Sequence, residues 1–148
     1  MRLTTYTDFA LRLLVYLGVR GNELCRLQDV ADAYGISKHH LVKVAQDLAG
    51  AGLIETVRGS GGGVRLLRPP EKISIGEVVR TTETDFFLVE CLDRSNPLCA
   101  IDSACILKGA LREALDNFLA TLDNYTLADV MIKKPRLSRL LGIPVTVQ

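Results

Sequence analysis

Two short stretches rich in branched apolar residues, 53–57 and 64–67, enclose the segment Arg-Gly-Ser-Gly-Gly-Gly at 58–63. Apolar runs of this length, separated by a turn, are typical of paired β-strands. Four glycines in six residues exceed what a two-residue hairpin turn needs. The sequence therefore predicts a hairpin with a longer turn, whose bare backbone can approach another molecule closely.

Three helical segments are predicted before this hairpin. Apolar residues recur at helical spacing over 5–20, and a second helix is predicted over 27–34. Gly35 then interrupts the pattern, and Ser37 is suited to cap a third helix that ends at Gly50. Two short helices joined at a glycine-containing turn match the helix-turn-helix pattern. A hairpin placed directly after that pattern is the wing of a winged helix.

The predicted fold class is therefore mainly α with a small β wing, and the winged helix-turn-helix domain is expected to span residues 1–70. In such a domain the start of the third helix enters the major groove, and an arginine of the wing can enter the minor groove. The residues suited to contact phosphates or base edges are Ser37, Lys38, His39, His40, Lys43, Arg58, Ser60, Gly61 and Arg65.

Two other interpretations of these residues remain open. The polar face of the third helix could be the solvated surface of an ordinary helical bundle. The glycine turn could hold a nucleotide phosphate, although it lacks the Lys-Ser/Thr ending and the following helix of such loops. His39 and His40 are adjacent on a helix and point in different directions, and no nucleophile or carboxylate pair accompanies them. The sequence therefore does not indicate an enzyme.

Net charge does not decide between these alternatives. The formal charge is +1, with nine Lys and Arg against six Asp and Glu in residues 1–68, and nine against eleven in 69–148. Any DNA binding must therefore depend on where individual cations lie. No stretch approaches the roughly 20 apolar residues of a membrane span, and no signal peptide is apparent. We therefore expect a cytoplasmic protein with no membrane partner.

A long apolar seam dominates the second half of the chain. Residues at spacings of three and four share one face of a helix of about four turns, and they are Leu107, Ala110, Leu111, Ala114, Leu115, Phe118, Leu119 and Leu122. The seam could pack on its own domain. Since operators are commonly read by two-fold dimers, we expect it to pair with the same helix of a second copy.

Shorter helices are predicted on both sides of this dimerisation helix, over 74–82 with Ser74 as its cap and near 126–132. The second predicted unit, 71–132, thus contains a cysteine-bearing loop and the dimerisation helix. Residues 133–148 form a C-terminal tail, in which we expect both the Lys-Lys-Pro-Arg run and the terminal residues to be weakly ordered.

Three cysteines, Cys91, Cys99 and Cys105, lie within fifteen positions, whereas Cys25 stands alone and is expected to be a packing residue. A disulfide would leave one thiol over in a reducing compartment, and a structural zinc normally takes four Cys or His ligands. An iron–sulfur cluster tolerates one ligand of another kind beside three thiolates. The spacing alone leaves a disulfide, zinc and a cluster open.

Four further motifs accompany these cysteines: Met-Arg-Leu-Thr with Thr7-Asp8 at the start, Val57-Arg58-Gly59 followed by Gly61-Gly62-Gly63, Ile-Gly-Glu-Val-Val at 75–79, and Leu-Asp-Asn-Tyr-Thr-Leu-Ala-Asp at 122–129. Together they resemble the winged-helix iron–sulfur repressors, over about residues 1–132. The resemblance implies a homodimer that represses transcription from palindromic promoter operators on double-stranded DNA. It also implies a cluster bound by Cys91, Cys99 and Cys105.

Within that family the chain is most similar to the nitric-oxide-sensing members. In those proteins an aspartate that matches Asp8 supplies the fourth cluster ligand from the partner subunit; otherwise Asp8 is an ordinary acid at a helix start. No histidine follows Cys105, so the resemblance favours [4Fe-4S] over [2Fe-2S]. The seven residues between Cys91 and Cys99 are also similar to iron-sensing members. Sensing of iron availability or redox state is therefore the alternative to sensing nitric oxide.

Overall fold

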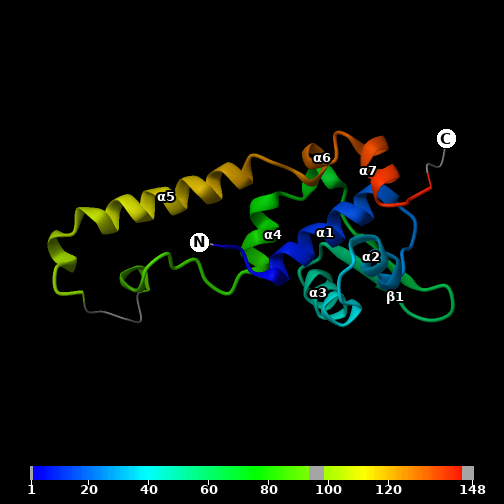
Figure 1. The fold of residues 1–148 in the computed structure, drawn as a ribbon, viewed down its shortest axis with the longest axis horizontal. Helices are drawn as coiled ribbons and strands as arrows, with labels where there is room; N and C mark the ends of the chain where they lie inside the picture. The colour runs from blue at the N-terminus through cyan, green and yellow to red at the C-terminus, as the bar shows by residue number, and fades with distance from the viewer. Residues whose placement is uncertain (1, 94–98, 145–148) are drawn as a thin grey trace.

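The computed structural model describes residues 2–93 and 99–144, which form a helical body and one protruding arm (Figure 1). The helices are α1 (Thr5–Arg20), α2 (Leu27–Tyr34), α3 (Lys38–Gly50), α4 (Ile75–Thr82), α5 (Ile106–Asp123), α6 (Leu127–Val130) and α7 (Lys134–Leu140). The strands are β1 (Ile54–Val57) and β2 (Gly63–Leu66), and the 3-10 turns are η1 (Pro70–Lys72), η2 (Glu90–Leu92) and η3 (Asp102–Ala104). The expected fold class, mainly α with a small β wing, is confirmed.

Helix α1 is the centre of the body. The Thr4 side chain accepts a hydrogen bond from the Thr7 backbone N–H, which satisfies an orphan donor of the first turn. The inward face of α1 is fully buried and consists of Ala10, Leu13, Leu14 and Leu17. It contacts α2, α3, α4, α6 and α7. A single core therefore joins the helix-turn-helix to elements from the other end of the chain.

The turn between α2 and α3 forms at Gly35, as predicted. Gly35 has a φ of 63°, a left-handed conformation that glycine adopts without a steric penalty. Its N–H donates to the last carbonyls of α2 and ends that helix. Ser37 stands at the predicted cap position of α3, but its side chain makes no capping hydrogen bond. The serine hydroxyl is therefore not used by its own helix.

The two strands pair antiparallel, with Ile54 opposite Leu66 and Val57 opposite Gly63. Cys25 extends this sheet, because its backbone N–H and carbonyl both bond to Val64 at 2.9 and 2.8 Å. Cys25 is 2% exposed, which agrees with the packing role expected for it. A Cβ on Gly63 would lie 2.5 Å from the Cys25 carbonyl oxygen. The pairing of Cys25 with β2 thus depends on a glycine at position 63.

We expect Gly63→Ala to lower the free energy of unfolding by about 1–3 kcal/mol, because neither strand backbone can retreat without breaking hydrogen bonds. Urea denaturation measures this change. Gly50→Ala is the matched control, since nothing lies within 4 Å of a Cβ there and α3 is helical at that residue. A Gly63 variant as stable as the Gly50 variant would contradict the expectation.

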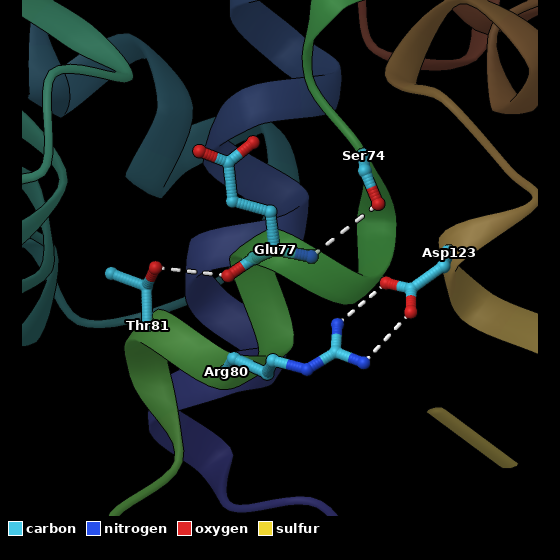
Figure 2. A network of polar contacts seen from close by, with 5 residues as sticks. All are labelled: Ser74, Glu77, Arg80, Thr81 and Asp123. Carbon is cyan, nitrogen blue, oxygen red and sulfur yellow. Dashed lines mark hydrogen bonds and ion pairs between the residues drawn. The ribbon is translucent and has the colours of Figure 1, made fainter. Parts of the chain in front are cut away.

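Helix α4 connects the body to the base of the arm (Figure 2). Its cap is Ser74, whose hydroxyl accepts the N–H of Glu77 at 3.4 Å, as the sequence predicted. The Arg80 guanidinium donates two hydrogen bonds to the Asp123 carboxylate at the end of α5, at 2.5 and 2.7 Å. A Cβ on Gly76 would lie 1.9 Å from an Asp123 carboxylate oxygen. The glycine therefore provides the space that this carboxylate occupies.

Two backbone hydrogen bonds lie beside this ion pair. Ile75 N–H donates to the Tyr125 carbonyl at 2.9 Å, and Leu127 N–H donates to the Ile73 carbonyl at 2.8 Å. Leu127 is completely buried in the core of the body. The chain therefore returns from the arm into the body immediately after α5 ends.

This junction should weaken in acid. Hydrogen bonding to Arg80 lowers the pKa of the Asp123 carboxyl, and the hydrogen bonds of Thr126 lower that of Asp129. Both carboxylates therefore stabilise the fold above about pH 4, and this contribution is lost as pH falls through the folded pKa values. We expect the midpoint of thermal unfolding to decrease as the pH is lowered from about 5 to about 3, roughly the titration range of such groups. The fall should be smaller for Asp123→Asn, and an equal fall would contradict this assignment.

The C-terminal segment differs from the expectation of weak order. Residues 134–140 form α7, in which Pro135 stands in the first turn, where its missing N–H costs no helical hydrogen bond. Ser138 and Ile143 are buried, and the Ser138 hydroxyl donates to the Ile143 carbonyl at 2.7 Å. Ile143 belongs to the core that contains α1. Residues 145–148 lie outside the described part.

No helix among the described residues is long and apolar enough to span a membrane.

Candidate functional site

The predicted DNA-contacting residues lie on the surface of α3 and on the turn between β1 and β2. Eight of the nine are exposed, and they are Ser37, Lys38, His39, His40, Lys43, Arg58, Ser60 and Gly61. Arg65 differs because its guanidinium pairs with Glu55 across the hairpin at 2.8 Å. Arg58 makes no ion pair among the described residues, so its charge is free to meet a phosphate.

Helix α3 is held against α1 by contacts that the sequence did not indicate. The Tyr6 hydroxyl lies 3.2 Å from the Lys43 carbonyl oxygen and also donates to the Asp47 carboxylate. Burial, together with the hydrogen bond and negative charge of Asp47, raises the pKa of Tyr6, so the phenol remains a donor. The Phe9 and His40 rings lie 6.1 Å apart, centroid to centroid. Tyr6 has no sequence signal of its own, because its role depends on how α1 crosses α3.

Arg26 is a further cation beside the wing. It is exposed and immediately precedes α2, and the adjacent Cys25 pairs with Val64 of β2. The sequence analysis did not name Arg26 among the DNA-contacting residues, and its position directly before a predicted helix is the sequence feature that could have identified it. Arg26 therefore adds an exposed cation next to strand β2 of the wing.

The three clustered cysteines are all free thiols, and the segments that carry them lie toward the free end of the arm (Figure 1). Cys91 is half-buried in η2, which contacts α5, and Cys99 is exposed. Cys105 is the N-cap of α5, and its sulfur accepts the Lys108 N–H at 3.4 Å. Lys108 also pairs with Asp102 at 2.5 Å. Within the predicted cysteine-bearing loop, residues 94–98 lie outside the described residues.

Asp8 lies in the first turn of α1, in the body rather than on the arm. Its carboxylate pairs with Arg12 at 2.9 Å, and the Arg12 guanidinium lies 5.6 Å from the centroid of the Tyr34 ring in α2. Within one chain, residues 2–93 and 99–144 contain no cluster of three His, Cys, Asp or Glu side chains that could hold a metal ion. One chain therefore does not bring Asp8 to the cysteines.

The donor chemistry of these residues nevertheless fits an iron–sulfur cluster. Thiolates are the ligands of such clusters, and all three thiols are free and at least partly accessible. The Asp8 carboxylate is half exposed and is held by a surface ion pair, which contributes little to stability and is easily exchanged. The four candidate ligands are thus accessible, and they lie on two different parts of the molecule.

The predicted dimerisation face on α5 lacks a cover from its own chain. No residue of α5 is fully buried. Leu107 is 65% exposed and Ile106, which the seam did not include, is 88% exposed. Ala110 and Ala114 are exposed, and the remaining seam residues, which are only half-buried, are Leu111, Leu115, Phe118, Leu119 and Leu122. An apolar helix face of this length is stable in water only when another surface covers it.

A hollow of about 480 Å³ lies beside the same helix. Its walls include Phe86 and Phe87 from the segment after α4, Leu115 and Phe118 from α5, and Leu3 from the N-terminal segment. Phe87 is 49% exposed. The uncovered apolar surface therefore continues from α5 toward the start of α1.

Comparison with known proteins gives consistent results. The Rrf2 family model, described as an iron-dependent transcriptional regulator, matches residues 3–133. The HTH-type transcriptional regulator NsrR of Bacillus subtilis is 50% identical over 142 residues, which are 95% of this chain and 97% of that protein. Among solved structures, CymR (YrzC), the global cysteine regulator of B. subtilis, matches with a TM-score of 0.71 and 24% identity over 88% of this chain and 95% of that one. T. potens IscR matches with a TM-score of 0.71 and 23% identity over 90% and 88% of the two chains.

Proposed function

Because the chain belongs to the Rrf2 family of transcriptional regulators, we propose that it represses promoters in response to nitric oxide, which it senses through an iron–sulfur cluster. Its NsrR-named relatives are transcriptional regulators, so the chain is a DNA-binding repressor and not an enzyme. The choice of nitric oxide rests on the sequence resemblance to the nitric-oxide-sensing members. The cluster is of the [4Fe-4S] type, and the regulator is a homodimer in the cytoplasm.

One observation carries this proposal: three free thiols lie on an arm whose α5 helix has an uncovered apolar face. Pairing α5 with the same helix of a second copy would cover that face. Helix α5 has 18 residues, and at a rise of ~1.5 Å per residue such a helix spans roughly 27 Å. Antiparallel arms of this length carry the thiols of one subunit to the body of the other. Asp8 of the partner subunit then completes the ligand set with Cys91, Cys99 and Cys105.

Two bodies held by paired arms present two α3 helices to one side of a duplex. Helix-turn-helix dimers read half-sites about 34–36 Å apart, which is one turn of DNA. Lys38, His39, His40 and Lys43 enter the major groove, and the Ser37 hydroxyl, unused as a cap, donates to a phosphate. Arg58 at the wing enters the adjacent minor groove. The repressor therefore binds palindromic operators.

The bound cluster supplies iron that a small molecule such as nitric oxide can attack. Loss of the cluster would free the cysteine segment of one subunit from the body of the other. Without a cluster the Asp8 carboxylate would pair with Arg12, as it does in the single chain. Among the described residues, η2 contacts α5 and Cys105 caps the start of that helix, so the cysteine segment is joined to the arm at these two places. The spacing of the two α3 helices is consequently no longer held at one turn of DNA.

The decisive experiment compares operator affinity in two states of anaerobically prepared protein. Protein with a visible cluster spectrum should bind a promoter fragment tightly, and addition of nitric oxide in stoichiometric amounts to iron should weaken binding by at least about tenfold, the cost of one misplaced base contact. Equal affinity in both states would overturn the mechanism. If iron chelation weakens binding and nitric oxide does not, the chain senses iron availability instead.

A further inference from the structure

We propose that Arg80, Asp123 and Gly76 form a clamp that sets the angle between the arm and the DNA-binding body, and thereby the spacing of operator half-sites that the dimer accepts. Gly76 and Arg80 lie on α4 and Asp123 ends α5, whereas Cys105 caps the opposite end of α5 and the predicted DNA-contacting residues lie on α3 and the wing. The inference rests on the proposed dimeric operator binding. It assigns the residues that make the dimer selective for one spacing.

The geometry of the clamp is specific. Arg80 and Asp123 form two parallel hydrogen bonds at 2.5 and 2.7 Å, an arrangement that fixes direction as well as distance (Figure 2). Asp123 is the last residue of α5, so the pair holds the arm where it leaves the body. A Cβ at position 76 would lie 1.9 Å from an Asp123 oxygen and 2.8 Å from an Arg80 nitrogen. The pair can close only because residue 76 is a glycine.

A second attachment lies next to the clamp, and together the two fix the angle between the arm and the body. The backbone bonds of Ile75 to Tyr125 and of Leu127 to Ile73 anchor the chain just beyond α5. An arm attached only at that backbone bridge could swing about Asn124. The Arg80–Asp123 contact lies on the other side of Asn124 and supplies the second fixed point. Two fixed points on one side of the body define the direction of α5.

The body transmits that direction to the recognition helix. Helix α4, which carries Arg80, is joined to α1 by a buried hydrogen bond between the Thr7 and Thr82 hydroxyls at 2.8 Å. Glu83, at the end of α4, accepts hydrogen bonds from the Thr4 N–H and hydroxyl at 2.8 and 3.0 Å. Helix α1 is in turn held to α3 through the Tyr6 hydroxyl. The arm, α4, α1 and α3 therefore move as one unit while the clamp is closed.

A dimer of such units should discriminate sharply between operators of different spacing. When the clamp opens, each body can tilt on its arm, so binding to the preferred spacing weakens and binding to other spacings is less penalised. A purely structural ion pair would lower stability without changing the ratio of affinities for two spacings. That ratio is therefore the measurement that identifies a positioning role.

The test uses the full chain and the palindromic duplex that wild-type protein selects from a random-sequence library, with versions lengthened or shortened by one base pair between half-sites. The variants are Asp123→Asn, which keeps the shape but loses the charge, and Gly76→Ala, which displaces the carboxylate while improving helix propensity. The ratio to be measured is the Kd for altered spacing divided by the Kd for native spacing. Both variants should reduce this ratio by about two- to fivefold, the range expected for one well-formed, partly exposed ion pair.

Glu77→Gln is the matched control. It removes an ion pair of similar length, Arg68–Glu77 at 2.7 Å, from the same helix α4, but that pair lies within the body. Its Kd ratio should equal that of wild-type protein. If both clamp variants fold and also keep the wild-type ratio, the clamp inference is wrong while the dimeric operator stands. If wild-type protein selects no palindrome, dimeric operator binding itself is overturned, and the clamp inference with it.

Discussion

Protein with Cys99 replaced by alanine is expected to bind no iron–sulfur cluster and to lose regulated operator binding. Cys99 is the most exposed of the three clustered thiols, so its removal disturbs no packing and acts on ligation alone. A cluster held by two cysteines and one carboxylate lacks the thiolate ligands that such clusters require. Visible absorption and iron content of anaerobically purified protein measure the loss. We expect both to fall to background.

Cys25→Ala is the matched control, because Cys25 is the one cysteine buried in the body. Loss of its sulfur leaves a small cavity and lowers stability by about 1 kcal/mol, while the cluster spectrum remains. If the Cys99 variant keeps the cluster absorbance, Cys99 is not a ligand. If the Cys25 variant folds but lacks that absorbance, Cys25 is not merely a packing residue.

Replacement of Arg58 by alanine is expected to weaken operator binding by roughly 10- to 100-fold, as for the loss of one good arginine contact to DNA. Arg58 is exposed beside the glycine turn, and no carboxylate among the described residues neutralises it. If the guanidinium also meets a phosphate, the slope of log affinity against log salt should fall by about 0.9. Fluorescence anisotropy at several salt concentrations measures both quantities.

The control for this prediction is Arg136→Ala in α7, which removes another exposed cation from the body. Its affinity and salt slope should remain close to those of wild-type protein, because α7 packs at the opposite end of α1 from Tyr6 and α3. Arg65→Ala should have a smaller effect than Arg58→Ala, since Arg65 is already paired with Glu55. Equal losses for Arg58 and Arg136 would show that only net charge matters.

Local sequence patterns predicted most of the helices and strands correctly. The limits of α1, α2 and α4 agree with the expected ranges; β1 begins one residue later than expected, and β2 lies one residue earlier in the chain. These elements carry their own signals, namely helical periodicity, the glycine between α2 and α3, and the serine that caps α4. Helix α7 was missed, because the proline in its first turn has the appearance of a helix breaker and its stability depends on burying Ile143.

The candidate site was predictable only in part. The exposed cations of α3 and the wing follow from helical spacing and from the glycine turn. Arg65 and Tyr6 do not, because the ion pair of one and the hydrogen bonds of the other depend on which strand or helix lies opposite. The separation of Asp8 from the three cysteines was likewise invisible in a linear pattern, although it is the reason that a second subunit is needed to complete the proposed ligand set.

By itself, then, the amino-acid sequence determined the helices, the wing, the residue types available to bind metal and DNA, and the family resemblance. These depend on neighbours within a few positions along the chain. Only the tertiary structure decided that α5 stands away from the body with its apolar face uncovered, and that Gly76 admits Asp123 to Arg80. Those features arise between residues more than 40 positions apart, whose mutual placement is determined by packing of the whole core rather than by local conformational preference.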